Sequence, residues 1–157
     1  GGMKIKYALV LALSHQAELL IMDEPTSGLD PLVRRQFLEI IMDYMKNGGK
    51  GVFFSTHITS DLDKVADVLI LIDGGKIVFQ QSKDELLDTF RIVKGSVALL
   101  NDRNKRLIRN LKISTYGFSA LTDRIADVKK EMPGVLFEKA SIEDIMLAYG
   151  GGKSDGR

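Results

Sequence analysis

The sequence predicts an α/β fold, because short apolar runs alternate with helical segments along most of the chain. Three continuous apolar runs, at residues 19–23, 52–55 and 68–73, are typical of strands covered on both faces of a parallel sheet. An amphipathic segment fills the interval between the first two runs. With 157 residues, 45% of them hydrophobic and 27% charged, the chain is long enough for a globular unit with a core of its own.

The first helix is expected at about residues 4–16, where the sequence is apolar nearly all round from Tyr7 to Leu13. A helix of that kind is expected to be buried on most sides. The longest apolar region, residues 7–22, is interrupted by four polar or charged side chains, so it does not predict a membrane span. We find no signal peptide, internal repeat or low-complexity tract.

The second helix is predicted to begin at Pro31, with Asp30 as its N-cap, and to end at Gly48 or Gly49. Its apolar stripe consists of Val33, Phe37, Ile40, Ile41 and Tyr44. A shorter helix, at about residues 60–66, leads to the third apolar run. This order of strand, helix and strand is typical of a parallel sheet.

A hairpin and a short helix are predicted after the third apolar run. The sequence Asp-Gly-Gly-Lys at residues 73–76 is a hairpin turn that leads into a strand at residues 77–80. Residues 82–85, Ser-Lys-Asp-Glu, form a capping box, which opens a helix that extends to Phe90.

The pattern changes past Gly95 and predicts a small α+β extension at residues 95–150. Strands are expected at residues 111–116 and 135–137, and helices at about residues 120–132 and 141–149. A basic cluster in this extension consists of Arg103, Lys105, Arg106 and Arg109. We interpret it as a solvated charged face, with an anionic lipid or phosphate site as the alternative. Residues 151–157 are expected to be disordered.

Charge and cysteine content exclude several classes of protein. The formal net charge of +1 gives no attraction of the whole molecule to nucleic acid or to anionic lipid. The absence of cysteine excludes disulfide bridges and thiolate metal sites, and it is compatible with a reducing cytosol.

Two adjacent carboxylates, Asp23 and Glu24, stand at the end of the first apolar run. Successive side chains of an extended segment point to opposite faces, so we expect the two acids to have separate partners. One can face a metal ion while the other faces a water molecule, a division that suits nucleotide hydrolysis. Taken alone, the pair could equally be the polar turn that ends a strand.

A histidine, His57, follows the second apolar run and is expected at the same sheet edge as Asp23 and Glu24. The carboxyl ends of strands in open α/β sheets are where ligands bind. A single histidine without such neighbours would more often be a hydrogen-bonded structural residue.

Four segments, taken in order, resemble the later part of an ATP-binding cassette (ABC) ATPase. Residues 19–24 resemble the Walker B segment with its catalytic glutamate, and residues 27–30, Ser-Gly-Leu-Asp, resemble the D-loop. Residues 53–57 resemble the strand that leads to the switch histidine. Residues 1–3 resemble the tail of the signature, usually Leu-Ser-Gly-Gly-Gln, with Met3 in place of the glutamine. Four motifs in the right order are far more specific than one.

The resemblance implies separate roles for the acidic pair and the histidine. Asp23 would hold Mg²⁺, through water, and Glu24 would be the general base for the water that attacks ATP. His57 would contact the γ-phosphate and orient Glu24. The cofactors implied are therefore ATP and Mg²⁺.

The resemblance also implies that the site is completed across a dimer. Gly1 and Gly2 precede a helix, whose unpaired N–H groups can bind the γ-phosphate of ATP held by the opposite subunit. Ser27 and Asp30 would belong to the subunit-crossing D-loop that links the two ATP sites. A capping role for Asp30 is compatible with this one.

The fold that the resemblance implies is a partial P-loop NTPase sheet that lacks the Walker A strand. Residues 1–94 would be the C-terminal part of the ATPase domain, and residues 95–150 would correspond to the variable extensions of bacterial exporter ATPases. No phosphate loop of the form Gly-x-x-x-x-Gly-Lys-Ser/Thr occurs in the sequence. We therefore interpret the chain as a C-terminal fragment that begins inside the signature, and we expect it to be inactive alone.

The predicted function is that of the ATP-hydrolysing subunit of an ABC transporter, a bacterial exporter. Its expected partners are a membrane permease and a second ATPase subunit, identical or different, with no nucleic acid. Its expected place is the cytoplasmic face of the cell membrane. Open strand edges in a partial sheet also predict self-association or strand exchange. Two alternatives stay open: a soluble ABC-type ATPase that acts on ribosomes or DNA, and a ligand-binding regulatory tail on an ATPase core.

Overall fold

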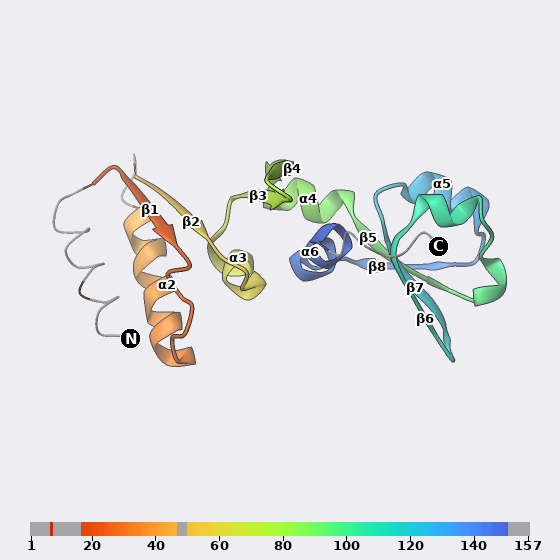
Figure 1. The fold of residues 1–157 in the computed structure, drawn as a ribbon, viewed down its shortest axis with the longest axis horizontal. Helices are drawn as coiled ribbons and strands as arrows, with labels where there is room; N and C mark the ends of the chain where they lie inside the picture. Colours follow the sequence, from red (N-terminus) through yellow and green to blue (C-terminus); the bar gives the residue numbers. More distant parts are fainter. Residues whose placement is uncertain (1–6, 8–16, 47–49, 151–157) are drawn as a thin grey trace. The chain divides into compact units, whose positions relative to one another are not determined.

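The computed structural model describes residue 7, residues 17–46 and residues 50–150. The chain divides into two compact units, residues 1–66 and 67–157, which we call the N-terminal and C-terminal units (Figure 1). This division lies upstream of the junction predicted near residues 94 and 95, while the assignment of functions to the two predicted domains stays a prediction. The helix expected at residues 4–16 lies outside the described residues except for Tyr7, which is helical and exposed. The predicted helix end at Gly48 or Gly49 and the tail at residues 151–157 also lie outside them.

The N-terminal unit pairs two parallel strands beside two helices. Its elements are β1 (Leu19–Asp23), α2 (Pro31–Lys46), β2 (Gly51–Ser55) and α3 (Thr59–Val65). The pairing register runs from Leu19 opposite Gly51 to Asp23 opposite Ser55. The two strands therefore end side by side, and the polar residues that follow each of them are brought to the same edge.

Helix α2 covers one face of this sheet. The buried cluster of the unit consists of Leu20, Phe37, Leu38, Ile41, Tyr44 and Val65. The predicted stripe was correct for Phe37, Ile41 and Tyr44, but Ile40 is 40% exposed and Leu38 is buried in its place. These two side chains flank the stripe on opposite sides of the helix, so the direction of the packed sheet decides which of them is covered.

On the other face of the β1–β2 sheet, the side chains of the described residues are exposed. Leu19, Ile21 and Phe53 are more than half exposed, whereas Leu20 between the first two is buried. The prediction of strands covered on both faces is therefore wrong for this pair. The described residues show a parallel sheet of two strands here, and the wider P-loop sheet stays a prediction.

The C-terminal unit begins with a hairpin of β3 (Val68–Asp73) and β4 (Lys76–Ser82). The third apolar run forms the predicted strand, and β3 pairs in antiparallel orientation with β4, as the predicted hairpin requires. The prediction that this run is covered on both faces is wrong, because Val68 and Ile72 are 56% and 63% exposed. Gly74 and Gly75 have φ angles of 54° and 74°, the left-handed conformations that a tight two-residue hairpin turn requires. The Asp-Gly-Gly-Lys turn is thus confirmed.

Helix α4 (Lys83–Thr89) follows β4 directly. The Ser82 hydroxyl accepts a hydrogen bond from the Glu85 amide at 3.3 Å, which confirms the predicted cap. The predicted helix end at Phe90 is one residue too late, because Phe90 is its C-cap.

A four-stranded antiparallel sheet forms the rest of the C-terminal unit. Its strands are β5 (Arg91–Gly95), β6 (Arg109–Ser114), β7 (Gly117–Thr122) and β8 (Leu136–Lys139), in the spatial order β6-β7-β5-β8. Two short 3-10 turns, η1 (Val97–Leu99) and η2 (Asn104–Leu107), and two helices, α5 (Ile125–Glu131) and α6 (Ile142–Gly150), complete the unit. Strand β5, an inner strand, was not predicted, because its end was interpreted as a junction between domains.

The core of this sheet consists of Val93, Ile108, Phe118, Ala120, Val128 and Met132. The helix predicted to begin at Ala120 begins at Ile125 instead, because residues 120–122 continue β7 and pair with β5. Pairing with a central strand overrides the helical pattern of those residues.

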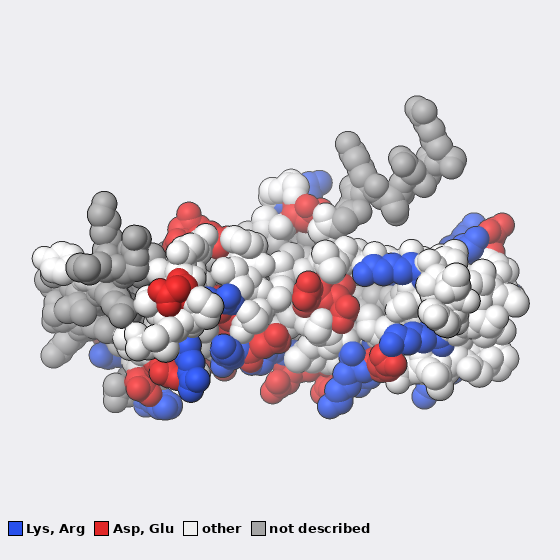
Figure 2. All heavy atoms as spheres, turned by 90° about the horizontal axis from the view of Figure 1, so that it is seen from below, with Lys and Arg blue, Asp and Glu red and all other residues white. Residues whose placement is uncertain are grey.

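Acidic and basic side chains are intermixed on the face drawn in Figure 2, in agreement with the near-zero net charge. Among the described residues, no helix combines the length and apolar character needed to cross a membrane.

Candidate functional site

The first candidate residue, Asp23, lies at the carboxyl end of β1, directly opposite Ser55 at the end of β2. The Ser55 hydroxyl donates a hydrogen bond to Asp23 Oδ1. Asp23 is exposed. Strand pairing thus places an accessible carboxylate at the sheet edge, with one oxygen held in a defined direction.

The second carboxylate, Glu24, lies just past the strand in a left-handed conformation, with a φ angle of 44°. Its amide donates to the backbone oxygen and to the hydroxyl of Ser55, each at 3.1 Å. Positive φ is uncommon for a residue with a side chain, and it persists where the surroundings hold it. The chain therefore turns at Glu24. The expectation that Asp23 and Glu24 point to opposite faces of one extended strand does not hold, because Glu24 lies outside the strand.

Glu24 and His57 are in direct contact. His57 Nδ1 lies 2.9 Å from Glu24 Oε1, with the histidine side chain 71% exposed and the glutamate side chain 35% exposed. The other carboxylate oxygen, Glu24 Oε2, is buried and has no hydrogen-bond partner among the described residues. A buried acceptor of this kind is usually satisfied by water or by a ligand. Asp23 and Glu24 therefore have different partners, as expected.

The loop after Glu24 leads to α2 through residues 27–30. The Ser27 amide donates to the Glu24 carbonyl at 3.1 Å, and Gly28 has a φ angle of 70°. Asp30 Oδ1 accepts from the amides of Leu32 and Val33 at 3.1 and 3.0 Å, which confirms Asp30 as the N-cap. Ser27 itself is exposed. The two other predicted binding residues, Gly1 and Gly2, lie outside the described residues.

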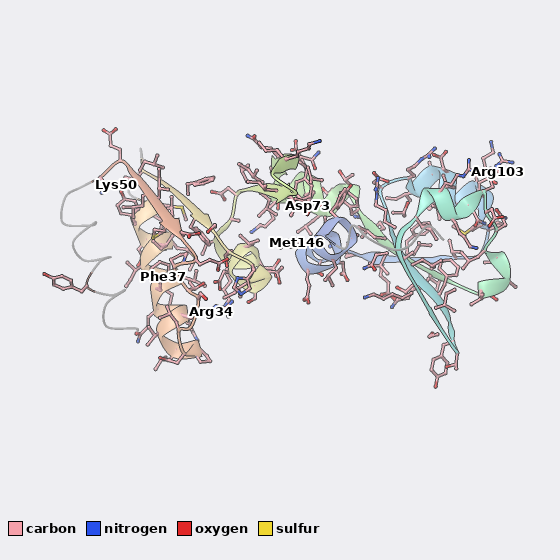
Figure 3. The ribbon with its side chains drawn as sticks, in the orientation of Figure 1. Arg34, Phe37, Lys50, Asp73, Arg103 and Met146 are labelled. Carbon is pink, nitrogen blue, oxygen red and sulfur yellow. The ribbon has the colours of Figure 1, made fainter. Side chains whose placement is uncertain are left out.

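Three further residues close to the site were not found from the sequence. Asp61, in the first turn of α3, is fully buried and accepts a hydrogen bond from Thr26 Oγ1 at 2.6 Å. Its other oxygen contacts the Arg34 guanidinium at 2.6 and 2.7 Å. Figure 3 labels Arg34 on α2. Thr26, Arg34 and Asp61 belong to separate segments, and no spacing links them. The position of Thr26, between the acidic pair and the next helix, was the one feature of the sequence that could have indicated a role at the site.

A separate polar cavity of 270 Å³ lies in the C-terminal unit, near the labelled Arg103 in Figure 3. Its lining consists of Arg103, Leu107, Arg124, Asp127, Lys130 and Glu131. Arg103 pairs with Glu131 at 3.0 Å, and Arg124 pairs with Asp127 at 2.7 Å. The charges of Arg103 and Arg124 are thus compensated within the unit, while the interpretation of the basic cluster as a solvated face stays a prediction.

Known proteins resemble this chain in both sequence and fold. Residues 2–63 match a family model described as "AAA domain, putative AbiEii toxin, Type IV TA system". An uncharacterized ABC transporter ATP-binding protein of Nostoc sp. is 42% identical over 86 residues, 55% of this chain and 25% of that protein. A protein of Mycoplasma pneumoniae named "Putative ABC transporter ATP-binding protein" is 33% identical over 134 residues, 83% of this chain and 40% of that protein.

Two further matches extend the comparison. The bacitracin transport ATP-binding protein of Bacillus licheniformis is 35% identical over 107 residues, 68% of this chain and 34% of that protein. A solved structure titled "An inward-facing conformation of a putative metal-chelate type ABC transporter" matches with a TM-score of 0.50 at 16% identity, over 88% of this chain and 47% of that chain. At that identity, the structural likeness concerns the fold alone.

These matches relate the chain to the ATP-binding proteins of ABC transporters, of which it corresponds to a part. It spans between a quarter and a half of the length of these curated relatives.

Proposed function

We propose that this chain is part of the ATP-hydrolysing subunit of an ABC transporter and that it contributes the residues that activate the attacking water. The observation that carries the proposal is the 2.9 Å contact between Glu24 and His57. It forms where the two parallel strands end side by side, beside the exposed carboxylate of Asp23. Ligand sites of open α/β sheets lie at such an edge.

In this proposal Glu24 is the general base. Its Oε2 has no hydrogen-bond partner among the described residues, so its capacity to accept a proton is not used within the chain, and the attacking water would have to reach this buried oxygen. His57 holds the other oxygen, Oε1, and thereby orients the carboxylate. The exposed position of His57 also leaves its ring accessible to a phosphate group.

The metal role falls to Asp23. No group of three or more His, Cys, Asp or Glu side chains converges within the described part of the chain. Mg²⁺ does not need one, because it commonly binds through one or two carboxylates together with substrate phosphates and water. An accessible carboxylate with one oxygen oriented by Ser55 fits that role. When bound, Mg²⁺ offsets the charge of the phosphates.

The remaining predicted residues would complete the site across the interface with a second ATPase subunit. Ser27, which is exposed, and the Asp30 loop would contact the second ATPase subunit, and Gly1 and Gly2 would bind the γ-phosphate of its ATP. The transported substrate would be handled by a membrane permease, which places the subunit at the cytoplasmic face of the membrane. The names of the bacitracin transport protein and its fellow relatives support this assignment to transport.

We further propose that the 157-residue chain alone does not hydrolyse ATP, because it contains no Walker A motif to hold the phosphates. The uncovered β1–β2 face, with Ile21 at 72% exposure, would favour self-association or strand exchange of the isolated chain. Isothermal titration of ATP into this chain is expected to give no binding in the micromolar range. Micromolar binding would contradict the proposal.

Replacement of Glu24 by glutamine tests the catalytic role in a complete ATPase that contains this sequence. We expect Glu24→Gln to retain nucleotide binding and to lose at least about a hundredfold in turnover, since a positioned general base contributes roughly that much. Glu39→Gln is the matched control, because Glu39 lies on the exposed face of α2 and pairs with Arg35. Near wild-type ATP turnover by Glu24→Gln would exclude Glu24 as the base.

A further inference from the structure

The four residues Thr26, Arg34, Ser60 and Asp61 form a hydrogen-bonded group that we call the Asp61 cluster. The Asp61 carboxylate is fully buried, and both of its oxygens are occupied. Oδ2 accepts from Thr26 Oγ1 at 2.6 Å, and Oδ1 contacts Arg34 Nε at 2.7 Å and Nη2 at 2.6 Å. The same Arg34 Nη2 donates to Ser60 Oγ at 2.6 Å. Thr26 is buried as well.

The position of the cluster along the chain connects it to the site. Thr26 follows Glu24 by two residues, and Asp61 follows His57 by four. The cluster therefore joins the loop that carries Glu24 to the first turn of α3, which directly follows the loop of His57, and Arg34 attaches Asp61 to α2. The Glu24–His57 contact itself is exposed on the histidine side, and exposed ion pairs contribute little by themselves.

A purely structural role explains the cluster less well. A buried charge carries a desolvation penalty that its pairing often only just repays, and an apolar group of similar volume would commonly serve stability equally well. What a buried hydrogen-bonded group adds is a defined geometry. Here the cluster fixes the relative position of the two segments that carry Glu24 and His57.

We propose that Asp61 is a positioning residue, which acts through Thr26 and Arg34 to hold Glu24 and His57 in contact. This inference rests on the proposed function, because positioning matters only if that pair carries the chemistry. The effect is indirect: Asp61 is buried and would not touch the nucleotide, but its loss would let the two loops move apart.

Amide hydrogen exchange on the 157-residue chain tests the geometric part. Thr26→Val removes the hydroxyl at nearly constant volume, and the control Thr26→Ser retains it. We expect Thr26→Val to raise exchange at the Glu24 and Ser27 amides by about tenfold or more, as for the loss of a hydrogen bond to a charged group. Amides within α2 should change by less than about twofold, because the opening is local. Equal acceleration throughout the N-terminal unit would show a structural role only and would overturn the proposal.

Steady-state kinetics of a complete ATPase containing this sequence test the functional part. Thr26→Val and Asp61→Asn are expected to lower kcat by about tenfold with little change in KM, while Thr26→Ser and the control Glu39→Gln stay near wild type. If Asp61→Asn does not fold, Thr26→Val decides the result. An unchanged kcat in Thr26→Val would overturn this inference. A wild-type protein without ATP hydrolysis would instead contradict the proposed function.

Discussion

The β1–β2 sheet of the N-terminal unit and the four-stranded sheet of the C-terminal unit differ in how completely they are covered. In the C-terminal unit, the inner strands β5 and β7 bury Val93, Phe118 and Leu121 almost fully against helices and turns. In the N-terminal unit, the β1–β2 sheet buries one face under α2 and leaves Ile21 and Phe53 exposed on the other. The candidate site belongs to the less covered sheet.

The difference follows from the two kinds of sheet. Antiparallel strands are joined by short hairpins and can form a stable sheet with one face in water. Parallel strands are normally buried on both faces, and a sheet of only two strands is marginal alone. We therefore expect cover over the exposed face of the β1–β2 sheet to add stability. Four sets of variants test this comparison.

The largest effect is expected from adjacent residues of β1. Leu20 is 6% exposed and Ile21 is 72% exposed. Leu20→Ala is expected to lower the free energy of unfolding by about 2–5 kcal/mol, the usual result of emptying a core position. In dilute solution Ile21→Ala should stay within about 0.5 kcal/mol, as surface substitutions do. Urea denaturation followed by circular dichroism measures both changes.

The concentration dependence of the same experiment sharpens the comparison. If copies of the chain cover the β1–β2 face, the unfolding midpoint of the wild type rises with protein concentration, and Ile21→Ala removes that rise. Equal destabilisation by Leu20→Ala and Ile21→Ala in dilute solution would mean that the face is already covered.

The next effect concerns two glycines of the C-terminal unit. Gly117 has a φ angle of 132°, and a Cβ there would lie 2.3 Å from the Gly95 carbonyl oxygen. Gly134 has a φ angle of 89°, but a Cβ there would meet no atom of the described residues within 4 Å. Both alanine variants carry backbone strain of roughly 1–3 kcal/mol. Gly117→Ala should be the less stable one because of the clash between β7 and β5. Thermal unfolding of the two variants checks this order, and equal stability would contradict it.

A smaller effect is expected at two helix caps, one in each unit. Asp30 accepts from two amides of α2, and the Ser141 hydroxyl accepts from the Asp144 amide of α6 at 3.1 Å. Asp30→Ala and Ser141→Ala should each lower stability by about 0.5–2 kcal/mol, because a cap acts locally. Asn replacements of the same residues serve as controls that preserve capping. A much larger loss at Asp30 would indicate that its loop is coupled to the site.

The smallest effect is a dependence on pH in the C-terminal unit. Burial raises the pKa of Tyr149, the nearby Asp123 adds to the rise, and Arg109 opposes it. The neutral phenol is thus favoured in the folded state, so its stabilisation is fully present below about pH 10, the unfolded pKa. It should be lost as the pH rises from there through the folded pKa. Urea denaturation at increasing pH measures the loss, and Tyr149→Phe should remove this contribution. An unaltered pH dependence in that variant would contradict it.

Local signals predicted a large part of the fold. The bounds of β1 and β3 agree with two continuous apolar runs, and the Asp-Gly-Gly-Lys turn and the Ser82 and Asp30 caps are as expected. The predicted start of α5 was wrong because residues 120–122 pair with β5 as part of a strand, although their sequence pattern is helical. Likewise, Leu38 replaced Ile40 in the core because the packed sheet, not the helix, sets which flank of α2 is covered.

The amino-acid sequence by itself determined which chemical groups stand at the ends of the strands, since caps, turns and apolar runs are decided within a few residues. It therefore indicated Asp23, Glu24 and His57 as candidates before any contact was known. Only the tertiary structure decided that Glu24 meets His57, 33 residues away, and that Thr26 meets Asp61, 35 residues away. Contacts at that separation depend on the register of two parallel strands and on the packing of α2 and α3. No periodicity within a single segment encodes them.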